Sequence, residues 1–427
     1  HRIQAPRRKL GVGEALVLAG EGEAECNEIA ASGGDARYVL AVYNTSSDPG
    51  STAGFKLSAP GGSPEGPARV VHATAPAPAY APGLPQGHDG AHLRIMEMNR
   101  REHARLRARP EGSARMQARA STAAAAGPPP LTRTIRVVDA SGGNCDRFYT
   151  VSATRVYYDG RIAIYEDDAS PAWVKAAANP RMRAYYDAIG EDYNTTTEPI
   201  LRRSFGDPLL RDGAMDANGV LVALVTPLLN TALGGVPAFV ASCDLFPNEA
   251  GNAASNHGEF LYLFQPTVNA PGFAGLTPEN WYSNIRSGII HEAKHLASLS
   301  ARVASDAWFD EPWLEEGTAR HAEELWSRQV LYGAAWKGNT GYGGEGQPNS
   351  IYCDVKRTAV CLARPGGPTI GMFRHIHELS TFLRYPTALS AFGQTAAGGG
   401  ASFYGTSWSL VRYAIDRYGA SEDAFLT

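Results

Sequence analysis

The sequence predicts an α+β protein in which strands precede a mainly helical C-terminal part. Between residues 132 and 264, β-branched and aromatic residues gather in short runs bounded by Gly, Pro, Asn and Asp. From residue 277 onward, apolar residues recur instead at the three- and four-residue spacing of amphipathic helices. The chain has 427 residues, so we expect two or three domains rather than one.

The composition argues against two classes of partner. The formal net charge is −4 at pH 7, which gives no reason to expect binding to nucleic acid or to an acidic membrane surface. No apolar run reaches roughly eighteen residues, so we expect no membrane span. The sequence begins at His1 without the apolar core of a signal peptide, and we therefore expect a processed or truncated chain.

The cysteines do not form a metal-binding pattern, because none has the C-x-x-C spacing. Only Cys353 and Cys361 lie close together, and they are the candidate disulfide pair. Closing that short loop would contribute roughly 2 to 3 kcal/mol to stability. The odd count of 5 leaves at least one thiol free.

Residues 10–75 are expected to form a small β-sandwich, either an accessory domain or a pro-domain. Runs containing Val, Leu, Tyr and Phe predict strands at 14–19, 37–44 and 54–58. No group of titratable residues with catalytic spacing occurs there. The alternative is a substrate-binding module.

Residues 76–131 differ in composition from what precedes them. Ala and Pro dominate both ends, and a helix is expected from about 92 to 108, continuing through 113–120. Arginines recur between Arg94 and Arg119. Such a run could hold an anionic partner, but we expect a solvated helix and linker. Ala- and Pro-rich connecting segments are common sites of proteolysis.

The region from 132 to 427 should contain the catalytic unit, with a sheet-containing lobe to about 300 and a helical lobe from 301. A helix is expected over 173–189. The run 260–264 is either an edge strand that pairs with substrate backbone or an ordinary core strand. The expected strands are 134–138, 148–158, 161–165, 220–226 and 260–264.

Capping signals place the helices that follow. Thr277 and Pro278 are an N-cap and a first-turn proline, and they open the helix that carries the first histidine motif. Pro312 marks the start of the next helix at Asp310 or Glu311. The last helix is expected from 406 to 418, ending at a glycine.

The motif His291-Glu292-Ala293-Lys294-His295 carries the chemistry. Two histidines four residues apart project from one face of a helix, where both imidazoles can bind one ion. This is the H-E-x-x-H pattern, in which the histidines bind zinc and the glutamate is the general base. The simpler alternative is a pair of ordinary core or surface histidines.

A second stretch, Trp313-Leu314-Glu315-Glu316-Gly317, follows on the next expected helix. A catalytic zinc has three protein ligands and an open fourth position. Glu316 is the candidate third ligand. Glu315 is the alternative, and its side chain should point about 100° away around the helix.

The W-L-x-E-G setting resembles that of the gluzincin metallopeptidases of the aminopeptidase type, in which the glutamate before the glycine binds the metal. More closely, the chain from about 135 to 420 resembles the hyicolysin family of secreted bacterial neutral metalloproteases. The residues that carry this resemblance occur in order: Ile164-Tyr165-Glu166-Asp167-Asp168, Phe205-Gly206-Asp207, Asp216-Ala217-Asn218-Gly219-Val220, Thr226-Pro227, Cys243-Asp244-Leu245-Phe246-Pro247, Ser255-Asn256-His257-Gly258-Glu259 and Tyr404-Gly405-Thr406-Ser407-Trp408.

The resemblance implies a zincin-like catalytic domain of a secreted endopeptidase, which hydrolyses protein or peptide substrates within the chain. It implies zinc at His291, His295 and Glu316, with Glu292 as base. Tyr404, placed just before the last expected helix, would donate to the oxyanion, with His321, His375 and His377 as alternatives. Carboxylates such as Glu323 are expected to hydrogen-bond the metal-binding histidines.

Three further possibilities remain open in the sequence. Asp212, Asp216 and Asn218 lie near a glycine and offer oxygen ligands for calcium, although their spacing is not that of an EF-hand and an Asx turn is the simpler reading. An aminopeptidase would need an acidic group for the substrate amine, and Glu259 could provide it. A non-catalytic binding protein with a structural zinc is the alternative from another class, but it would not need Glu292.

Overall fold

The computed structural model describes residues 7–10, 16, 18, 28–29, 88–108, 128–233, 236–268, 276–305, 307, 312–338, 371–384 and 400–426. The chain divides into two compact units, residues 1–72 and 73–427. In the first unit, strand β1 (Arg7–Arg8) pairs in parallel with β2 (Glu28–Ile29). Neither strand was expected from the sequence. The strands expected at 37–44 and 54–58, most of the strand expected at 14–19, and the pair Cys353 and Cys361 lie outside the described residues.

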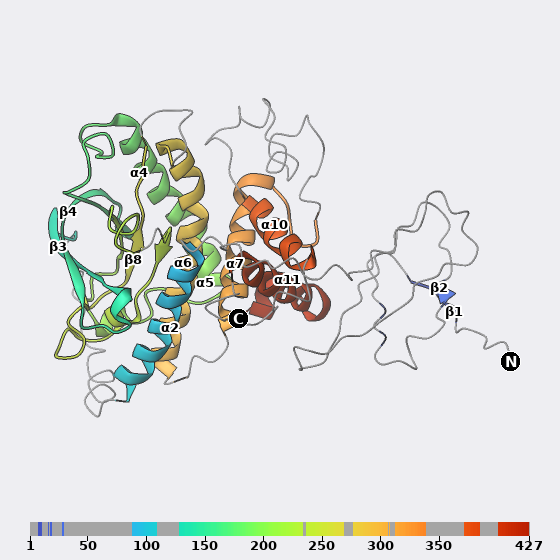
Figure 1. Ribbon diagram of the computed structural model, residues 1–427. Helices are drawn as coiled ribbons and strands as arrows, with labels where there is room; N and C mark the ends of the chain where they lie inside the picture. The colour runs from blue at the N-terminus through green and yellow to red at the C-terminus, as the bar shows by residue number, and fades with distance from the viewer. Residues whose placement is uncertain are drawn as a thin grey trace, which may run out of the picture. The chain divides into compact units, whose positions relative to one another are not determined.

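The second unit contains a mixed sheet with the strand order β3-β4-β5-β6-β8-β7 (Figure 1). Strands β3, β4 and β5 are antiparallel neighbours, β5, β6 and β8 run parallel, and β7 is antiparallel to β8. Their bounds are Thr132–Val138, Phe148–Tyr158, Ile162–Asp167, Leu221–Val225, Ala238–Phe239 and Phe260–Leu263 for β3 to β8. The mixture of sheet and helices is compatible with the α+β class.

Burial explains why the central strands could be predicted from the sequence. Every residue of β5, β6 and β8 is buried, and continuous apolar runs are typical of strands covered on both faces. β4 instead alternates between exposed and buried positions at its start. β7 has only two residues and gave no such signal.

Of the two interpretations of the run 260–264, the structure bears out the core strand. β8 lies between β6 and β7, so it is an interior strand, and β7 is the last strand of the described sheet. Ala238 and Phe239 pair with Leu263 and Tyr262 on that side of β8. The backbone that continues beyond β7 therefore borders the sheet.

The helix expected over 173–189 begins later in the structure. α4 spans Pro180–Asp192, because Asn179 caps it and Pro180 fills its first turn. A π-helical turn, Tyr193–Thr197, joins it to α5, Glu198–Ser204. Sequence periodicity missed α5.

α6 spans Pro278–Ser305 and begins where its cap predicts. The Thr277 hydroxyl accepts a hydrogen bond from the backbone N–H of Asn280 at 3.2 Å. α7 spans Pro312–Ser327 and contacts α6. In Figure 1, α6 lies between the sheet and the group formed by α7, α10 and α11.

The C-terminal part is helical, as expected. α10 spans Gly371–Arg384, α11 spans Gly400–Tyr418 and α12 spans Glu422–Leu426. α11 begins six residues before the expected 406, so Tyr404 lies within this helix and not ahead of it. No helix in the described part of the chain is long and apolar enough to cross a membrane.

The arginine-rich helix α2, His88–Arg107, is not a solvated linker. Ile95, Met96 and Met98 belong to the main hydrophobic core, and α2 contacts α11 and the 3₁₀ turn Ser242–Leu245. Arg94 is exposed, so at that position the charge faces solvent while the opposite face packs inward.

A disulfide joins Cys145, in the connection between β3 and β4, to Cys243, with the Cα atoms 5.9 Å apart. The two cysteines are separated by 98 residues in sequence. Sequence spacing drew attention to Cys353 and Cys361 because only that pair was close along the chain. The pairing of Cys145 with Cys243 depends on the sheet topology and could not be predicted from spacing along the chain.

Candidate metal centre

α6 brings His291 and His295 to one point. They lie four residues apart on consecutive turns, and both are buried. Their imidazole rings are 4.7 Å apart between centroids, and the two Nε2 atoms face each other at 3.1 Å. Ile285, Ile289 and Leu296 belong to the core cluster and fix the helix that carries the histidines.

A carboxylate orients each imidazole from behind. His291 Nδ1 lies 2.7 Å from Glu323 Oε1, and His295 Nδ1 lies 2.7 Å from Glu315 Oε1. Since a carboxylate accepts, we assign the proton to Nδ1 in both rings, which leaves each Nε2 lone pair free to bind an ion. Glu323 was anticipated in this role, and Glu315 takes the corresponding role for His295.

Buried cations fix these two carboxylates in turn. Arg320 Nη1 donates to Glu323 at 3.0 Å, and Lys294 Nζ lies 2.8 Å from Glu315. Burial alone would raise the pKa of Glu323, but Arg320 and the neighbouring histidines hold that pKa well below its usual range. Both carboxylates are therefore charged acceptors.

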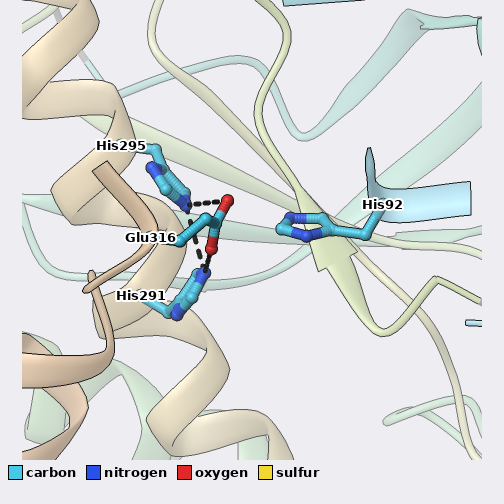
Figure 2. Close-up of side chains that lie close together, drawn as sticks. All are labelled: His92, His291, His295 and Glu316. Atoms are coloured by element: carbon cyan, nitrogen blue, oxygen red, sulfur yellow. Dashed lines mark hydrogen bonds and ion pairs between the residues drawn. The ribbon is translucent and has the colours of Figure 1, made fainter. Parts of the chain in front are cut away.

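Glu316 completes the site from α7 (Figure 2). Its two oxygens lie 3.3 Å from His291 Nε2 and 3.6 Å from His295 Nε2. The side chain is 0% exposed, and within the described residues neither oxygen has a hydrogen-bond partner of good geometry. Two imidazole nitrogens and a carboxylate thus converge on one buried point and could hold a metal ion.

The electrostatics of the site favour a cation. Burial lowers the pKa of His295, but Glu316 and Glu315 outweigh it and raise that pKa to about 10. Burial likewise opposes ionisation of Glu316, yet the histidines hold its pKa well below the ordinary value. The carboxylates stabilise a proton on these imidazoles, and the same negative charge would stabilise a metal ion bound there.

The surroundings of Gly317 explain why the candidate third ligand, Glu316, is followed by glycine. A Cβ on Gly317 would lie 2.7 Å from the backbone oxygen of Ser407 in α11. Only a residue without a side chain lets α7 approach α11 this closely. The approach brings the helix that carries Glu316 against the helix that carries Tyr404.

Sequence analysis missed His92, which lies beside these ligands. Ligand atoms of His92, His291, His295 and Glu316 all lie within 4.8 Å of one another. The His92 ring is 5.9 Å from that of His291 between centroids, and Figure 2 shows it facing the other three side chains. Burial lowers the pKa of His92 to about 3, although Glu316 opposes the shift, so this imidazole is neutral. A lone histidine in a segment assigned to a linker gave no signal.

Glu292 and Tyr404 also lie at this point. Glu292 Oε1 is 3.7 Å from His92 Nε2, and burial raises the pKa of Glu292. The Tyr404 hydroxyl is 2.7 Å from His92 Nδ1, and the Arg320 guanidinium lies 4.7 Å from the centre of the tyrosine ring. The structure thus brings the expected base and the expected oxyanion donor to the metal-binding residues.

The alternative donors lie in other surroundings. His321 Nε2 is 2.8 Å from Glu422, at the junction of α7 and α12. His375 stacks on Trp408 and lies behind the site, 3.6 Å from Glu323. His377 belongs to α10, and its side chain lies outside the described residues.

The candidate calcium residues form a cluster with a different membership. Asp212, Asp216 and Glu259 have carboxylate oxygens within 4.8 Å of one another. Asn218 instead donates its amide N–H to Asp216 and accepts from the backbone of Val220, as in the Asx turn weighed from the sequence. Its Oδ1 is therefore already engaged in the turn, and we centre the candidate site on the three carboxylates.

Glu259 is the unusual member of that cluster. Its side chain is buried, and neither of its oxygens has a hydrogen-bond partner in the part of the chain that the structure describes. Burial, followed by the charges of Asp212 and Asp216, raises the pKa of Glu259 to about 9. Burial also raises the pKa of Asp216 to about 6. The nearest ion pair of the group is a long one, from Arg133 to Asp216 at 4.0 Å, and neither oxygen of Glu259 shares it.

A third group consists of His321, Glu324 and Glu422. It differs from the first two groups because its carboxylates already pair with arginines. Arg328 forms ion pairs with both Glu324 and Glu422, and Arg412 forms another with Glu324. Protein cations take the place that an ion would need. We assign no metal site to it.

No protein-family model matches the chain, and a search of curated proteins finds no matching sequence.

Proposed function

We propose that the protein is a zinc metallopeptidase of the gluzincin kind, with a zincin-like catalytic domain. The observation that carries this proposal is the convergence of three ligand atoms from His291, His295 and Glu316, with Glu292 beside them. The sequence resemblance to the hyicolysin family supports the same function. The disulfide between Cys145 and Cys243 is typical of proteins from oxidising compartments and supports secretion.

Ligand type and spacing favour zinc. Two imidazoles and one carboxylate are ligands that zinc accepts, at bond lengths of about 2.0 to 2.2 Å. A tetrahedron of that size has edges of about 3.3 Å. The two Nε2 atoms lie 3.1 Å apart, and each lies 3.3 or 3.6 Å from a different oxygen of Glu316, so these separations are close to those edges.

A zinc ion bound there would polarise a peptide carbonyl and lower the pKa of a water molecule. Glu292 would take a proton from the attacking water and pass it to the leaving amine. Its buried carboxyl, with a raised pKa, is suited to carrying a proton between two groups. Tyr404 would donate its hydroxyl hydrogen to the developing oxyanion, and Arg320 stacked on its ring would hold that side chain in place.

The position of Glu259 favours an endopeptidase over an aminopeptidase. Glu259 belongs to the carboxylate cluster with Asp212 and Asp216 and not to the group around His291. An amine anchor would need to lie next to the metal-binding residues. The same cluster, rich in oxygen ligands and buried, is a candidate calcium site, and we propose calcium as its ion.

A structural zinc in a non-catalytic binding protein is the competing explanation. It would need the two histidines and Glu316 but would give no reason to bury Glu292 and Tyr404 at the same point. The two explanations differ in what Glu292→Gln should do, because that change removes a base and no ligand.

The test compares the parent with Glu292→Gln and Glu316→Ala, each as the full chain and after limited proteolysis. We expect Glu292→Gln to keep stoichiometric zinc and to lose at least about 99% of the hydrolysis of a denatured protein. Glu316→Ala should lose zinc as well. Stoichiometric zinc without hydrolysis in any parent form would support the structural explanation, and zinc retained by Glu316→Ala would exclude Glu316 as a ligand.

A further inference from the structure

His92 lies where its imidazole could occupy the fourth position that a catalytic zinc would keep open. A site with three protein ligands has its fourth tetrahedral position available for water or substrate. The His92 imidazole comes from α2 and lies with its ligand atom within 4.8 Å of those of His291, His295 and Glu316. Four protein ligands describe a closed site instead.

The same imidazole also engages both proposed catalytic side chains. Its Nδ1 is 2.7 Å from the Tyr404 hydroxyl, and its Nε2 is 3.7 Å from Glu292 Oε1. His92 therefore occupies the hydroxyl of the proposed oxyanion donor and lies close to the proposed base. While α2 stays docked, its imidazole stands beside the groups that a substrate carbonyl would have to reach.

Asn99, two helical turns further along α2, occupies backbone groups beside the sheet. Its Nδ2 donates to the Val240 carbonyl at 2.8 Å, and its Oδ1 accepts from the Ser242 N–H at 2.8 Å. Both backbone groups continue the chain beyond β7, the last strand of the described sheet. A carboxamide presents N–H donors and a carbonyl acceptor side by side, so Asn99 makes the pair of bonds that the backbone of an extended peptide would make there.

Other contacts along α2 hold it in this position. Ile95 and Met98 are buried in the core between His92 and Asn99. Glu102 accepts a hydrogen bond from the backbone N–H of Cys145, and Arg105 donates to the Gly251 carbonyl. The helix is packed along much of its length, which a flexible connection between domains would not require.

We propose that α2 is a built-in inhibitory segment, with His92 as the fourth metal ligand and Asn99 covering the backbone that would pair with substrate. This proposal rests on the proposed peptidase function. The Ala- and Pro-rich sequence between α2 and β3 offers a place for the cut that would release the segment. After such a cut α2 is no longer held at high effective concentration, and it can leave.

The test uses the full chain and compares His92→Ala with Arg94→Ala, a matched control on the exposed face of the same helix. The first measurement is zinc affinity by chelator competition. Removing a residue that only hydrogen-bonds a metal ligand typically weakens zinc affinity 10- to 100-fold. Removing a ligand itself should weaken the affinity by at least as much, while the control keeps the parent value. The second measurement is hydrolysis of a denatured protein, which should rise at least about tenfold in His92→Ala.

A spectroscopic measurement distinguishes the loss of a metal ligand from a general destabilisation of the site. With cobalt in place of zinc, the visible spectrum of His92→Ala should shift when free imidazole is added, because the fourth position is then open. The parent and Arg94→Ala should not respond. Asn99→Ala keeps His92 and should raise hydrolysis by less than His92→Ala does, so it serves as a second variant if the first is unstable.

The outcomes are distinct. Equal zinc affinity, cobalt spectrum and hydrolysis in His92→Ala and Arg94→Ala would overturn the proposal. Weaker zinc binding in His92→Ala with no hydrolysis in any form, cleaved chain included, would overturn the peptidase function and with it the inhibitory role. Activity in the uncleaved parent equal to that of the cleaved chain would overturn inhibition even if His92 binds the metal.

Discussion

Gly317 in α7 faces the backbone carbonyl of Ser407 in α11 so closely that an added Cβ would lie 2.7 Å from the oxygen. We expect Gly317→Ala to destabilise the fold, because the obstacle is backbone and cannot rotate away. The gain in helix propensity, about 1 kcal/mol, would not offset the clash. Zinc affinity should fall too, since Glu316 is the preceding residue.

Gly288 provides a matched control for that change. It is also a helical glycine, near the metal-binding residues, but an added Cβ would meet only ordinary contact, 4.0 Å from Ile285. Gly288→Ala should raise stability by about 0.5 to 1 kcal/mol. Thermal unfolding and zinc competition measure both variants, and equal behaviour of the two would mean that α7 and α11 can separate without consequence.

Tyr404→Phe should reduce kcat of the cleaved enzyme by roughly 10² with little change in KM, because the hydroxyl bond strengthens only in the transition state. Zinc content should not change. Tyr413→Phe is the control, since Tyr413 lies on the same helix and is 46% exposed. Parent-like kcat in Tyr404→Phe would remove this tyrosine from the mechanism.

Calcium should stabilise the protein through Glu259. At a calcium concentration 100 times Kd, the gain is about 2.7 kcal/mol of unfolding free energy. Glu259→Gln should cancel this gain, and without calcium at pH 7 it should unfold at a higher temperature than the parent, because it removes the cost of protonating a buried carboxyl whose pKa is raised to about 9. Terbium luminescence reports binding directly. The exposed Glu191→Gln is the control, and a calcium response that survives Glu259→Gln would exclude this cluster.

The junction of α7 and α12 should make stability fall in acid. Burial lowers the pKa of His321 below 6.5. Burial alone would raise the pKa of Glu422, but His321 and Arg328 outweigh it and lower that pKa below 4.5. For both groups the folded state binds protons less readily than the unfolded state. Their contribution is therefore present above about pH 7 and is lost as the pH falls through 6.5 and then 4.5.

Thermal unfolding from pH 7 to pH 4 measures this effect. Glu422→Gln should lower the unfolding temperature at pH 7 by about 2 °C or more and should flatten the part of the decline below pH 5. Glu191→Gln again serves as the control. An unchanged pH profile in Glu422→Gln would assign the acid sensitivity to other groups.

The sequence allowed good prediction where local signals coincide with the fold. Thr277 and Pro278 placed the start of α6, and the buried runs placed β5, β6 and β8 within a few residues. Local spacing also singled out His291, His295 and Glu316, which the structure brings together, because helical periodicity sets the first pair.

What could not be predicted depends on contacts between distant segments. His92 lies roughly 200 positions before His291, and Cys145 pairs with a cysteine 98 residues away. Neither relation has a local spacing. The arginines of α2 were read as a solvated face, which is correct for Arg94, but the buried side of the same helix was overlooked because its apolar residues are few.

The disulfide joins two segments that α2 also holds. Glu102 accepts from the backbone of Cys145, and Asn99 accepts from the residue before Cys243, so one helix positions both segments that the disulfide joins. If α2 is released as we propose, the covalent bond would replace these contacts and keep the backbone beside β7 in place.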